Sequence, residues 1–379
     1  MKQGRYDAVP LERVRWGTPA ADAVAEESER LGAKRVFVVA SGTLSRKTNA
    51  IGAIRRALGD RDAGLFDECK EHTPLESVIA CVQAVRAASA DLIATVGGGS
   101  PIDMVKVVQL CLTHDVHDIA GLKTFAGKPT TEPSAIRQII APTTLSGGEY
   151  SSMAGATDTA RKMKDMYAAP DMCGRVIMLD PALVRHTPQW LWLSTAIRAL
   201  DHAVEGYCAL STNALVQGTA LQAMKLFAQS LPATRHDADD LEARQSSQMA
   251  VWLAASSLGR VPMGASHGIG YLLGTLHGVP HGYTSCVMLP AVLKWNAPVL
   301  GTADNDIATA LGQPEATASE AVGALIAALG LPRTLGDVGV KESDIAQIAA
   351  FAARHPVVRA NPRPVESAAD AEAILRLAL

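Results

Sequence analysis

The sequence DLIATVGGGSPIDMVK, residues 91–106, is the most informative segment of the N-terminal half. Its apolar run ends in three glycines, after which Ser100 and Pro101 open a helical pattern. A glycine turn between a buried strand and a helix lets backbone N–H groups approach an anion, which the helix N-terminus also attracts. A tight turn without a ligand fits these residues too, because a glycine run alone is weak evidence. The stretch therefore predicts a strand, a turn and a helix, with a candidate phosphate site at the turn.

Similar units surround this stretch. Short apolar runs predict strands at 35–40, 63–67, 91–96, 139–141 and 176–179, and helical patterns lie between them at 46–58, 75–88 and 100–112. This alternation predicts a doubly wound, Rossmann-like parallel sheet with helices on its faces. Residues 111–137 show no clear pattern, and we interpret them as a surface excursion.

The second half has a different character. Ala- and Leu-rich segments with helical periodicity lie at 190–210, 213–231, 240–258, 304–312, 315–329, 342–354 and 368–378. A chain of 379 residues is long enough for two domains. We therefore expect a dinucleotide-binding α/β domain over residues 1–187 and an all-α helical domain over residues 188–379.

Composition limits the partners. The chain is 48% hydrophobic and 19% charged, with a formal net charge of −3, so it lacks the basic excess of a nucleic-acid binder. No apolar run approaches the roughly 20 residues that cross a bilayer, and no secretory signal is evident. The six cysteines are scattered without a CxxC pair. We expect a cytoplasmic protein with reduced thiols that acts on a small molecule and binds neither nucleic acid nor membrane.

A second loop, PTTLSGGE at 142–149, follows a predicted strand and carries hydroxyl groups suited to phosphate or ribose. Here the chain resembles the iron-type alcohol dehydrogenases, because residues 97–106 match their GGGS-x-x-D-x-x-K signature and residues 142–149 their PTT-x-x-(small)-x-E loop. The resemblance implies a homodimer and a dehydroquinate synthase-like architecture. It also implies cofactor contacts from Gly97, Gly98, Gly99, Ser100, Asp103, Thr143, Thr144, Ser146 and Lys164.

Cofactor choice depends on the end of the strand at 35–40. An acidic residue there would favour NAD(H) by binding the ribose hydroxyls and repelling a 2′-phosphate. This sequence has Ser41 at that place, and Arg46 and Lys47 follow closely. We therefore count Ser41 among the cofactor-binding residues and expect either NAD(H) or NADP(H) to be accepted.

The catalytic residues are expected in the helical half. The segments TAIRALDHAVEGY (195–207) and SHGIGYLLGTLHGVPHG (266–282), and Asn361-Pro362-Arg363, are similar to motifs of the same family. By this resemblance His202, His267 and His281 match three of four metal ligands. The fourth position, which holds Asp in metal-binding members, is Arg198 here.

That exchange disfavours a bound metal. A guanidinium about 4 Å from a cation adds repulsion of about 4 kcal/mol per unit charge at an effective dielectric near 20. Asp201 points about 300° away from Arg198 on an ideal helix, so it recovers the lost ligand direction only in part. Iron or zinc should bind weakly or not at all unless Arg198 swings away. Tyr271 stands where many members have another His; its hydroxyl could donate a proton, or the ring could simply pack.

The maleylacetate reductase branch shares three features with this chain: His72-Thr73-Pro74, the lack of an acidic residue at Ser41, and a non-Asp residue at 198. Its substrate is a dianionic oxo-acid, which an arginine suits. We expect NAD(P)H-dependent reduction of a small anionic carbonyl compound, with the nicotinamide across the cleft between the domains. Arg198 and the three imidazoles would supply positive potential, and Tyr271 or His277 the proton.

Other functions stay open at this stage. A metal-dependent alcohol dehydrogenase of simple alcohols would use the imidazoles as ligands. A lyase on the same scaffold, as in dehydroquinate synthases, or a relative that only binds dinucleotide would leave the net redox state of the cofactor unchanged. A test of substrate conversion beside NAD(P)H loss separates these from a reductase.

Overall fold

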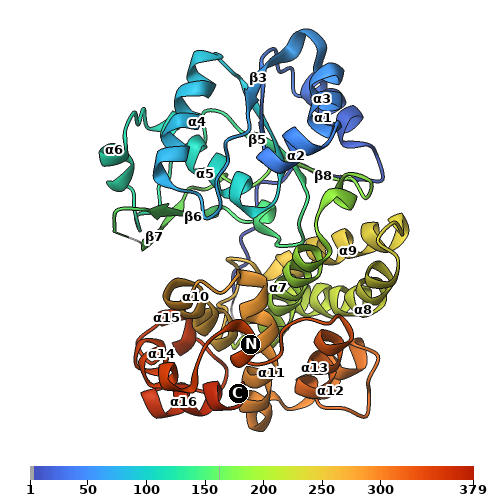
Figure 1. Cartoon of the computed structure of the whole chain (residues 1–379), viewed down its shortest axis with the longest axis vertical. Coiled ribbons are helices and arrows are strands. Elements are labelled where there is room, and N and C mark those ends of the chain that lie inside the picture. Colours follow the sequence, from blue (N-terminus) through green and yellow to red (C-terminus); the bar gives the residue numbers. More distant parts are fainter. Residues whose placement is uncertain (1–3, 162) are drawn as a thin grey trace. The chain divides into compact units, whose positions relative to one another are not determined.

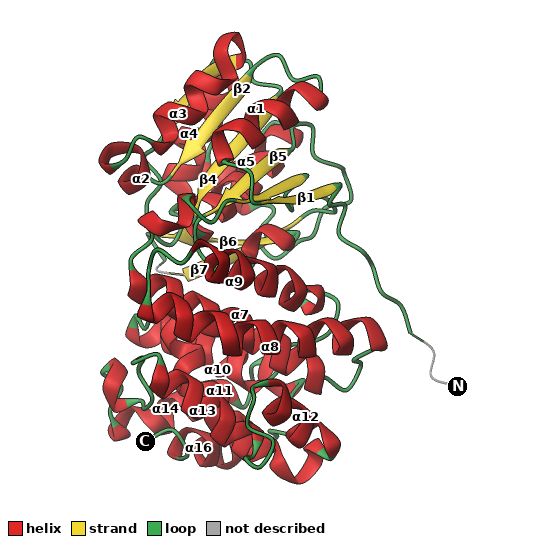
Figure 2. Ribbon diagram, turned by 90° about the vertical axis from the view of Figure 1, so that its right-hand side faces the viewer, coloured by secondary structure: helices red, strands yellow, loops and turns green. Residues whose placement is uncertain are grey.

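The computed structural model describes residues 4–161 and 163–379, drawn in Figures 1 and 2. The chain divides into two compact units. One is Asp7–Thr187, and the other is Pro188–Leu379 together with the segment that ends at Tyr6. The phenol of Tyr6 donates a 3.0 Å hydrogen bond to the carbonyl of Ser256, which ties this segment to the second unit.

The first unit is built on a six-stranded sheet in the order β1-β8-β5-β4-β2-β3. Every pairing in it is parallel, as the prediction of a doubly wound sheet requires. The central strands are buried along their whole length, which explains their continuous apolar sequences. The strands are β1 (Arg13–Trp16), β2 (Val36–Ala40), β3 (Asp62–Phe66), β4 (Leu92–Gly97), β5 (Gln138–Pro142) and β8 (Val176–Leu179).

Helices cover both faces of this sheet (Figure 1). Alternate residues of β2 enter different cores: Val36 and Val38 pack with α1 (Ala20–Arg30) and α3 (Ala50–Leu58). Phe37 and Val39 pack with α4 (Leu75–Ala87) and α5 (Gly99–Thr113) on the other face. This two-residue alternation is what a strand between two helical layers demands.

Some elements were not predicted. The short strand β1 reads as Arg-Val-Arg-Trp, which is too polar to be recognised. A two-stranded antiparallel hairpin, β6 (Met153–Asp158) and β7 (Met163–Ala168), packs Ala154, Ala156 and Tyr167 into the α4–α5 core. Residues 111–137 lie mostly at the surface, as predicted, although the short helix α6 (Ile119–Lys123) within them buries Leu122. The remaining short helix of this unit is α2 (Gly42–Lys47).

The second unit is helical, as predicted. Its helices are α7 (Gln189–Cys208), α8 (Ala214–His236), α9 (Leu241–Ala254), α10 (Ala265–His277), α11 (His281–Leu300), α12 (Thr302–Ala310), α13 (Ala318–Ala328), α14 (Ile345–Ala352), α15 (Pro356–Arg359) and α16 (Ala368–Arg376), seen in red in the lower part of Figure 2. No helix among the described residues has both the length and the apolar character needed to cross a membrane.

The sequence did not predict α10 or α11, because glycine and proline lower helix propensity. Both helices form through packing. A Cβ on Gly268 would lie 2.5 Å from Cγ2 of Val358, and one on Gly270 would lie 2.9 Å from Oγ1 of Thr284. The glycines of α10 therefore let α11 and α15 approach closely, which is the reason for a glycine-rich helix at this point.

Candidate active site

In the first unit, the strand order places a ligand site at the ends of β2 and β4. The chain runs from β2 to β3 on one side of it, and then to β4 on the other side. Ligands of parallel α/β sheets bind outside the carboxyl ends of the strands at such a reversal. Ala40 pairs with Val96 at this edge, so Ser41 and the turn from Gly97 follow on neighbouring strands. The side chain of Ser41 caps α2 by accepting from the N–H of Leu44 at 3.3 Å.

The turn at residues 97–99 has room only for glycine at two positions. Gly97 has φ +154°, and a Cβ there would lie 2.6 Å from Cγ of Pro101. A Cβ on Gly98 would lie 2.8 Å from Cγ2 of Thr144. Helix α5 begins at Gly99 with Gly98 as its N-cap and without a side-chain cap. No side chain caps its first N–H groups, so they are available to bind a phosphate.

The loop after β5 lies directly against this turn. The N–H of Thr143 donates to the carbonyl of Gly97 at 2.9 Å. The hydroxyl oxygens of Thr144 and Ser146 are 3.3 Å apart, and Ser146 Oγ is 3.6 Å from where a Cβ of Gly99 would be. The structure thus brings the two predicted cofactor loops together within one unit.

Asp103 and Lys164 lie farther along the same surface. Lys106 is fully buried, and its ammonium donates to Asp103 Oδ1 at 3.1 Å and to the carbonyls of Gly148 and Met153 at 2.6 and 2.9 Å. Asp103 Oδ2 accepts from the N–H of Gly155 at 3.4 Å. The side chain of Lys164 crosses over Gly155. These contacts fasten the second loop and the hairpin to α5.

Glu149, in the loop after β5, is also a buried ionisable residue. Its side chain is 1% exposed, and Oε2 has no hydrogen-bond partner among the described residues. Burial raises the pKa of Glu149 to about 7, although its backbone hydrogen bond and the nearby Lys106 charge oppose that shift. The carboxyl group is thus partly protonated at neutral pH.

Thr73 supports the turn and was not singled out as a site residue. His72 and Thr73 have φ values of +60° and +53°, a conformation that residues other than glycine rarely adopt. The hydroxyl of Thr73 donates to the carbonyl of Ser100 at 3.2 Å, and its own carbonyl accepts from the N–H of Thr157 at 2.9 Å. Two consecutive left-handed residues are thus held where α5 begins. From the sequence this segment was noted only as the start of a helix and as part of the family resemblance, and α4 does begin directly after Pro74.

In the second unit, α7 carries a stripe of buried polar side chains. Arg198, Asp201, His202 and Glu205 recur at the three- and four-residue spacing that shares one helix face, and each is at most 8% exposed. Charged groups this deep in a protein require partners. The partners come from α10 and α11.

Asp201 lies at the centre of this cluster. Its Oδ2 accepts hydrogen bonds from the hydroxyls of Ser266 and Ser285, both at 2.7 Å. Arg198 Nη1 donates to Ser285 Oγ at 3.1 Å and is 3.9 Å from Asp201 Oδ2. The sequence suggested Asp201 only as a substitute metal ligand. In the structure it faces the arginine as a counter-charge, and no sequence signal identified the two serines.

Glu205 binds the beginning of α10. Its Oε1 accepts from the N–H of Ser266 and its Oε2 from the N–H of Gly264, both at 2.8 Å. Oε2 also accepts from Nδ1 of His267 at 2.7 Å. Asn361 adds an acceptor for the N–H of Ala265 at 3.2 Å, which gives the Asn-Pro-Arg segment a structural role. A carboxylate at a helix N-terminus is stabilised by the helix dipole.

The pKa values of the two imidazoles in the cluster are shifted in opposite directions. Burial and Arg198 would lower the pKa of His267, but Asp201 and Glu205 outweigh them and raise it above its ordinary value. Burial, His267 and Arg198 together hold the pKa of His202 well below its ordinary value. His267 and Arg198 also lower the pKa of Asp201 against the effect of burial. His202 is therefore neutral, beside an ionised Asp201.

Tyr271 lies at the edge of this cluster and is 38% exposed. Cζ of Arg198 is 5.3 Å from the centre of its ring, and the ring centres of His267 and His355 are 6.3 and 6.1 Å away. His355 was not predicted; its Nδ1 accepts from the N–H of Val357 at the start of α15. The ring of Tyr271 thus lies beside Arg198 and two imidazoles at the edge of the cluster.

The remaining predicted histidines are less central. His281 begins α11, and its ring lies 3.6 Å from where a Cβ of Gly274 would be. His281 precedes Ser285 by one turn on the same helix face. His277 ends α10 ten residues after His267, which places it roughly 15 Å along the helix axis. The structure does not bring His277 into the cluster.

Two family descriptions match the chain: "Iron-containing alcohol dehydrogenase" over residues 12–181 and "Fe-containing alcohol dehydrogenase family, C-terminal" over residues 192–379. The chain belongs to the iron-containing alcohol dehydrogenase family. A dehydrogenase of Alternaria alternata is 35% identical over 87% of this chain and 95% of its own length. A maleylacetate reductase of Pseudomonas sp. strain P51 is 29% identical over 96% and 95%, respectively. Relatives of this kind identify the chain as an oxidoreductase.

Solved structures of the iron-containing alcohol dehydrogenase family support the fold. The maleylacetate reductase of Agrobacterium tumefaciens is 27% identical, with a TM-score of 0.86 over 100% of this chain and 99% of that one. A 1,3-propanediol oxidoreductase is 28% identical, with a TM-score of 0.91 over 99% and 100%. The alternation of strands and helices followed by a helical unit is therefore the family architecture.

The name of the iron-containing alcohol dehydrogenase family implies a metal, so we tested the donors against one. Asp201, Glu205 and His267 have ligand atoms that all lie within 4.8 Å of one another. However, Asp201 Oδ2 and both Glu205 oxygens already accept hydrogen bonds, and His267 Nδ1 donates to Glu205. The guanidinium of Arg198 is 3.9 Å from Asp201. These donors do not fit a divalent ion without breaking several charge-assisted bonds.

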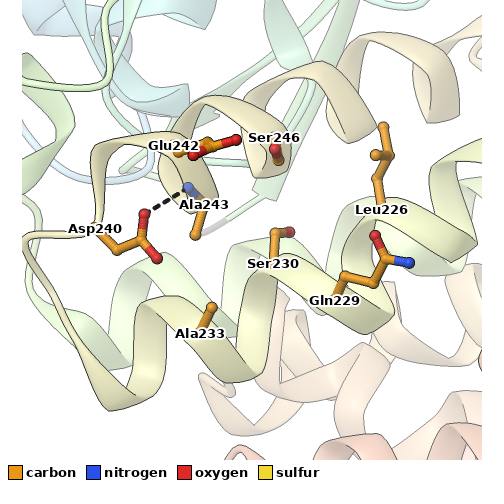
Figure 3. A pocket seen from close by; sticks show the side chains of 8 residues that line it. All are labelled: Leu226, Gln229, Ser230, Ala233, Asp240, Glu242, Ala243 and Ser246. Carbon is orange, nitrogen blue, oxygen red and sulfur yellow. Dashed lines mark hydrogen bonds between the residues drawn. The ribbon is translucent and has the colours of Figure 1, made fainter.

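A surface groove elsewhere in the helical unit is not part of this site. It lies between α8 and α9, has a volume of about 200 Å³, and contains none of the predicted site residues (Figure 3). Asp240 lines it and caps α9 by accepting from the N–H of Ala243 at 2.9 Å. The carboxylate is thus used in helix capping.

Proposed function

We propose that the chain is an NAD(P)H-dependent reductase of a small anionic carbonyl or oxo-acid substrate, of the kind that maleylacetate reductases act on. This proposal rests on Arg198, which is buried but has hydrogen-bond donors left unbound. Its guanidinium is 8% exposed, and Nη1 binds Ser285. Nε and Nη2 make no hydrogen bond to any described residue. This edge presents two parallel N–H donors, which is the geometry that binds a carboxylate in two places.

The cofactor proposal rests on the first unit. Ser41, the turn at residues 97–100 and the loop at residues 143–146 line the end of β2, β4 and β5, where a pyrophosphate and ribose would lie. No carboxylate stands at Ser41 to exclude a 2′-phosphate. Arg46, 3.5 Å from Asp67, is a nearby positive charge. Both NADH and NADPH are therefore proposed as donors.

When bound, the reduced nicotinamide supplies a hydride to the carbonyl or enoyl carbon. Arg198 would orient the substrate through its carboxylate and stabilise negative charge as it develops on oxygen. Nδ1 of His267 donates to Glu205 Oε2 at 2.7 Å, and Nε2 on the other side of the ring is buried and without a partner among the described residues. An N–H at that atom, or the hydroxyl of Tyr271, would donate the proton to the product.

Substrates that differ only in charge test this proposal. Initial rates of NADPH and NADH loss are measured with maleylacetate and other short oxo-acids, and with the corresponding neutral methyl esters. We expect the acids to react with at least 100-fold higher kcat/KM, since a charge-assisted bidentate contact contributes about 3 kcal/mol. Arg198→Gln should remove most of this difference, and Arg198→Lys, which keeps the charge, should retain part of it. Equal rates for acid and ester in the unmodified protein would refute an anionic substrate.

A second function has one observation in its favour. His202 and His267, two of the three imidazoles that match the family's metal ligands, have ring centres 4.8 Å apart, as a metal-dependent alcohol dehydrogenase of uncharged alcohols would need. Such an enzyme would oxidise 1,3-propanediol or ethanol with NAD⁺ only after addition of Fe²⁺ or Zn²⁺. Conversion of substrate without net change in NAD(P)H would indicate a lyase instead. A homodimer is a separate proposal, tested by light scattering of the purified chain.

A further inference from the structure

We infer that Arg198 and Asp201 form a built-in ion pair that replaces the divalent ion of this family, with Asp201 as the residue that positions Arg198. Only the binding of substrate by Arg198 rests on the proposed function. The exclusion of a metal by the buried charges does not depend on the reaction.

The balance of charge is the first argument. Four ionisable groups meet in this cluster: Arg198, His267, Asp201 and Glu205, which are linked by contacts of 3.9, 3.4 and 2.7 Å. Arg198 and Asp201 already face each other as opposite charges in a site that is almost closed to water. A divalent ion beside them would add positive charge next to a guanidinium that cannot lose its own. Uncompensated charge is strongly disfavoured in such surroundings.

The carboxylate oxygens of the cluster are already occupied by hydrogen-bond donors. Asp201 Oδ2 takes both serine hydroxyls and faces the arginine and the imidazole. Glu205 takes the first N–H groups of α10 and the ring of His267. An ion at these oxygens would have to displace donors that also hold α10 against α7. The only buried carboxylate oxygen of the pair without a partner among described residues is Asp201 Oδ1.

The third argument is the geometry of Ser285, which joins the pair. Its hydroxyl donates to Asp201 Oδ2 at 2.7 Å and accepts from Arg198 Nη1 at 3.1 Å. A hydroxyl that donates in one direction and accepts from another fixes the rotation of the guanidinium. Asp201 thereby holds Arg198 with its Nε–Nη2 edge unbound.

Metal content tests the inference without reference to activity. Purified protein is stripped with chelator, incubated with anaerobic Fe²⁺ or with Zn²⁺, desalted and measured by plasma mass spectrometry. We expect the unmodified chain to retain far less than one ion per chain. The paired variant Arg198→Asp with Asp201→Ser removes the guanidinium and places a carboxylate one turn before His202. It should retain about one ion per chain and show a metal-dependent rise in Tm.

The matched control is Arg198→Ser with Asp201→Ser, which removes the same two charges without adding a carboxylate at position 198. It should bind markedly less metal than the pair that carries Arg198→Asp. One ion per chain in the unmodified protein overturns the inference. A folded Arg198→Asp pair that binds no more metal than the control overturns it as well. Circular dichroism establishes that each variant is folded.

A single variant keeps the inference testable if the paired variants do not fold. Asp201→Asn keeps the shape but removes the counter-charge, and Asp201→Glu restores the charge. For the acid substrates we expect Asp201→Asn to raise KM by tenfold or more with a smaller change in kcat, and Asp201→Glu to recover part of it. A uniform loss of active protein with unchanged KM contradicts a positioning role. If no acid is reduced by the unmodified chain, the proposed function fails while the metal result stands.

Discussion

The buried carboxyl of Glu149 should make the first unit less stable as the pH rises. Its pKa is raised from 4.5 to about 7, because burial opposes ionisation. A group whose pKa is raised in the folded state contributes stability that is fully present below its unfolded pKa and is lost as the pH rises through its folded pKa. The window therefore runs from about pH 4.5 to pH 7. A shift of this size corresponds to about 3 kcal/mol above that window.

The substitution Glu149→Gln tests this directly, because an amide stays neutral throughout. The free energy of unfolding of both proteins is measured with urea between pH 5 and pH 8. Relative to the unmodified chain, the variant should become more stable by about 2 kcal/mol across this range. Glu132→Gln is the control, since Glu132 is exposed in a loop. A difference between Glu149→Gln and the unmodified chain that is constant with pH would refute the reasoning. It would mean that Glu149 is ionised in the folded state throughout.

Three further substitutions have definite expectations. Gly98→Ala places a Cβ 2.8 Å from Cγ2 of Thr144 and should weaken NADPH binding by about tenfold, measured by fluorescence titration. The circular dichroism spectrum should change little, and an unchanged affinity would show that this turn does not contact the cofactor. Ser41→Asp should raise the KM for NADPH by at least about tenfold and leave that for NADH nearly unchanged, because its carboxylate repels a 2′-phosphate; equal effects on both cofactors would argue against a ribose site at β2. Gly282→Ala places a Cβ 2.6 Å from the backbone carbonyl carbon of Ser194, which is rigid, and should destabilise the helical unit by about 1–3 kcal/mol; a Tm equal to that of the unmodified chain contradicts the close contact of α7 and α11.

The sheet could be predicted from sequence because its strands are buried on both faces. Val36–Ala40 and Leu92–Gly97 are continuous apolar runs that end in turn residues, and both predicted strands are confirmed. Strand β1 and the β6–β7 hairpin were missed, since their sequences mix charged and small residues with few apolar side chains. Their pairing is fixed by tertiary contacts rather than by local preference.

In the helical half, too, tertiary contacts form an element that its local sequence does not predict. Helix α10 contains Gly268, Gly270 and Gly274, so its propensity is low, and it forms because Glu205 and Asn361 bind its first N–H groups. The residues on α7 were identified from spacing and resemblance. Among their partners, His267 was identified by the same resemblance, but Ser266 and Ser285 were not, because a serine hydroxyl that binds a buried charge has no signature in sequence. The role of Asp201 became evident only when those helices were placed beside it.

We propose that this member of the iron-containing alcohol dehydrogenase family reduces an anionic carbonyl substrate with Arg198 in the place of a metal. The most direct measurement is turnover of NADPH with maleylacetate by protein dialysed against chelator, with the metal content determined on the same sample. Our account predicts an undiminished kcat in the metal-free protein, with no gain on adding Fe²⁺ or Zn²⁺. Turnover that appears only when one of these ions is restored would contradict it.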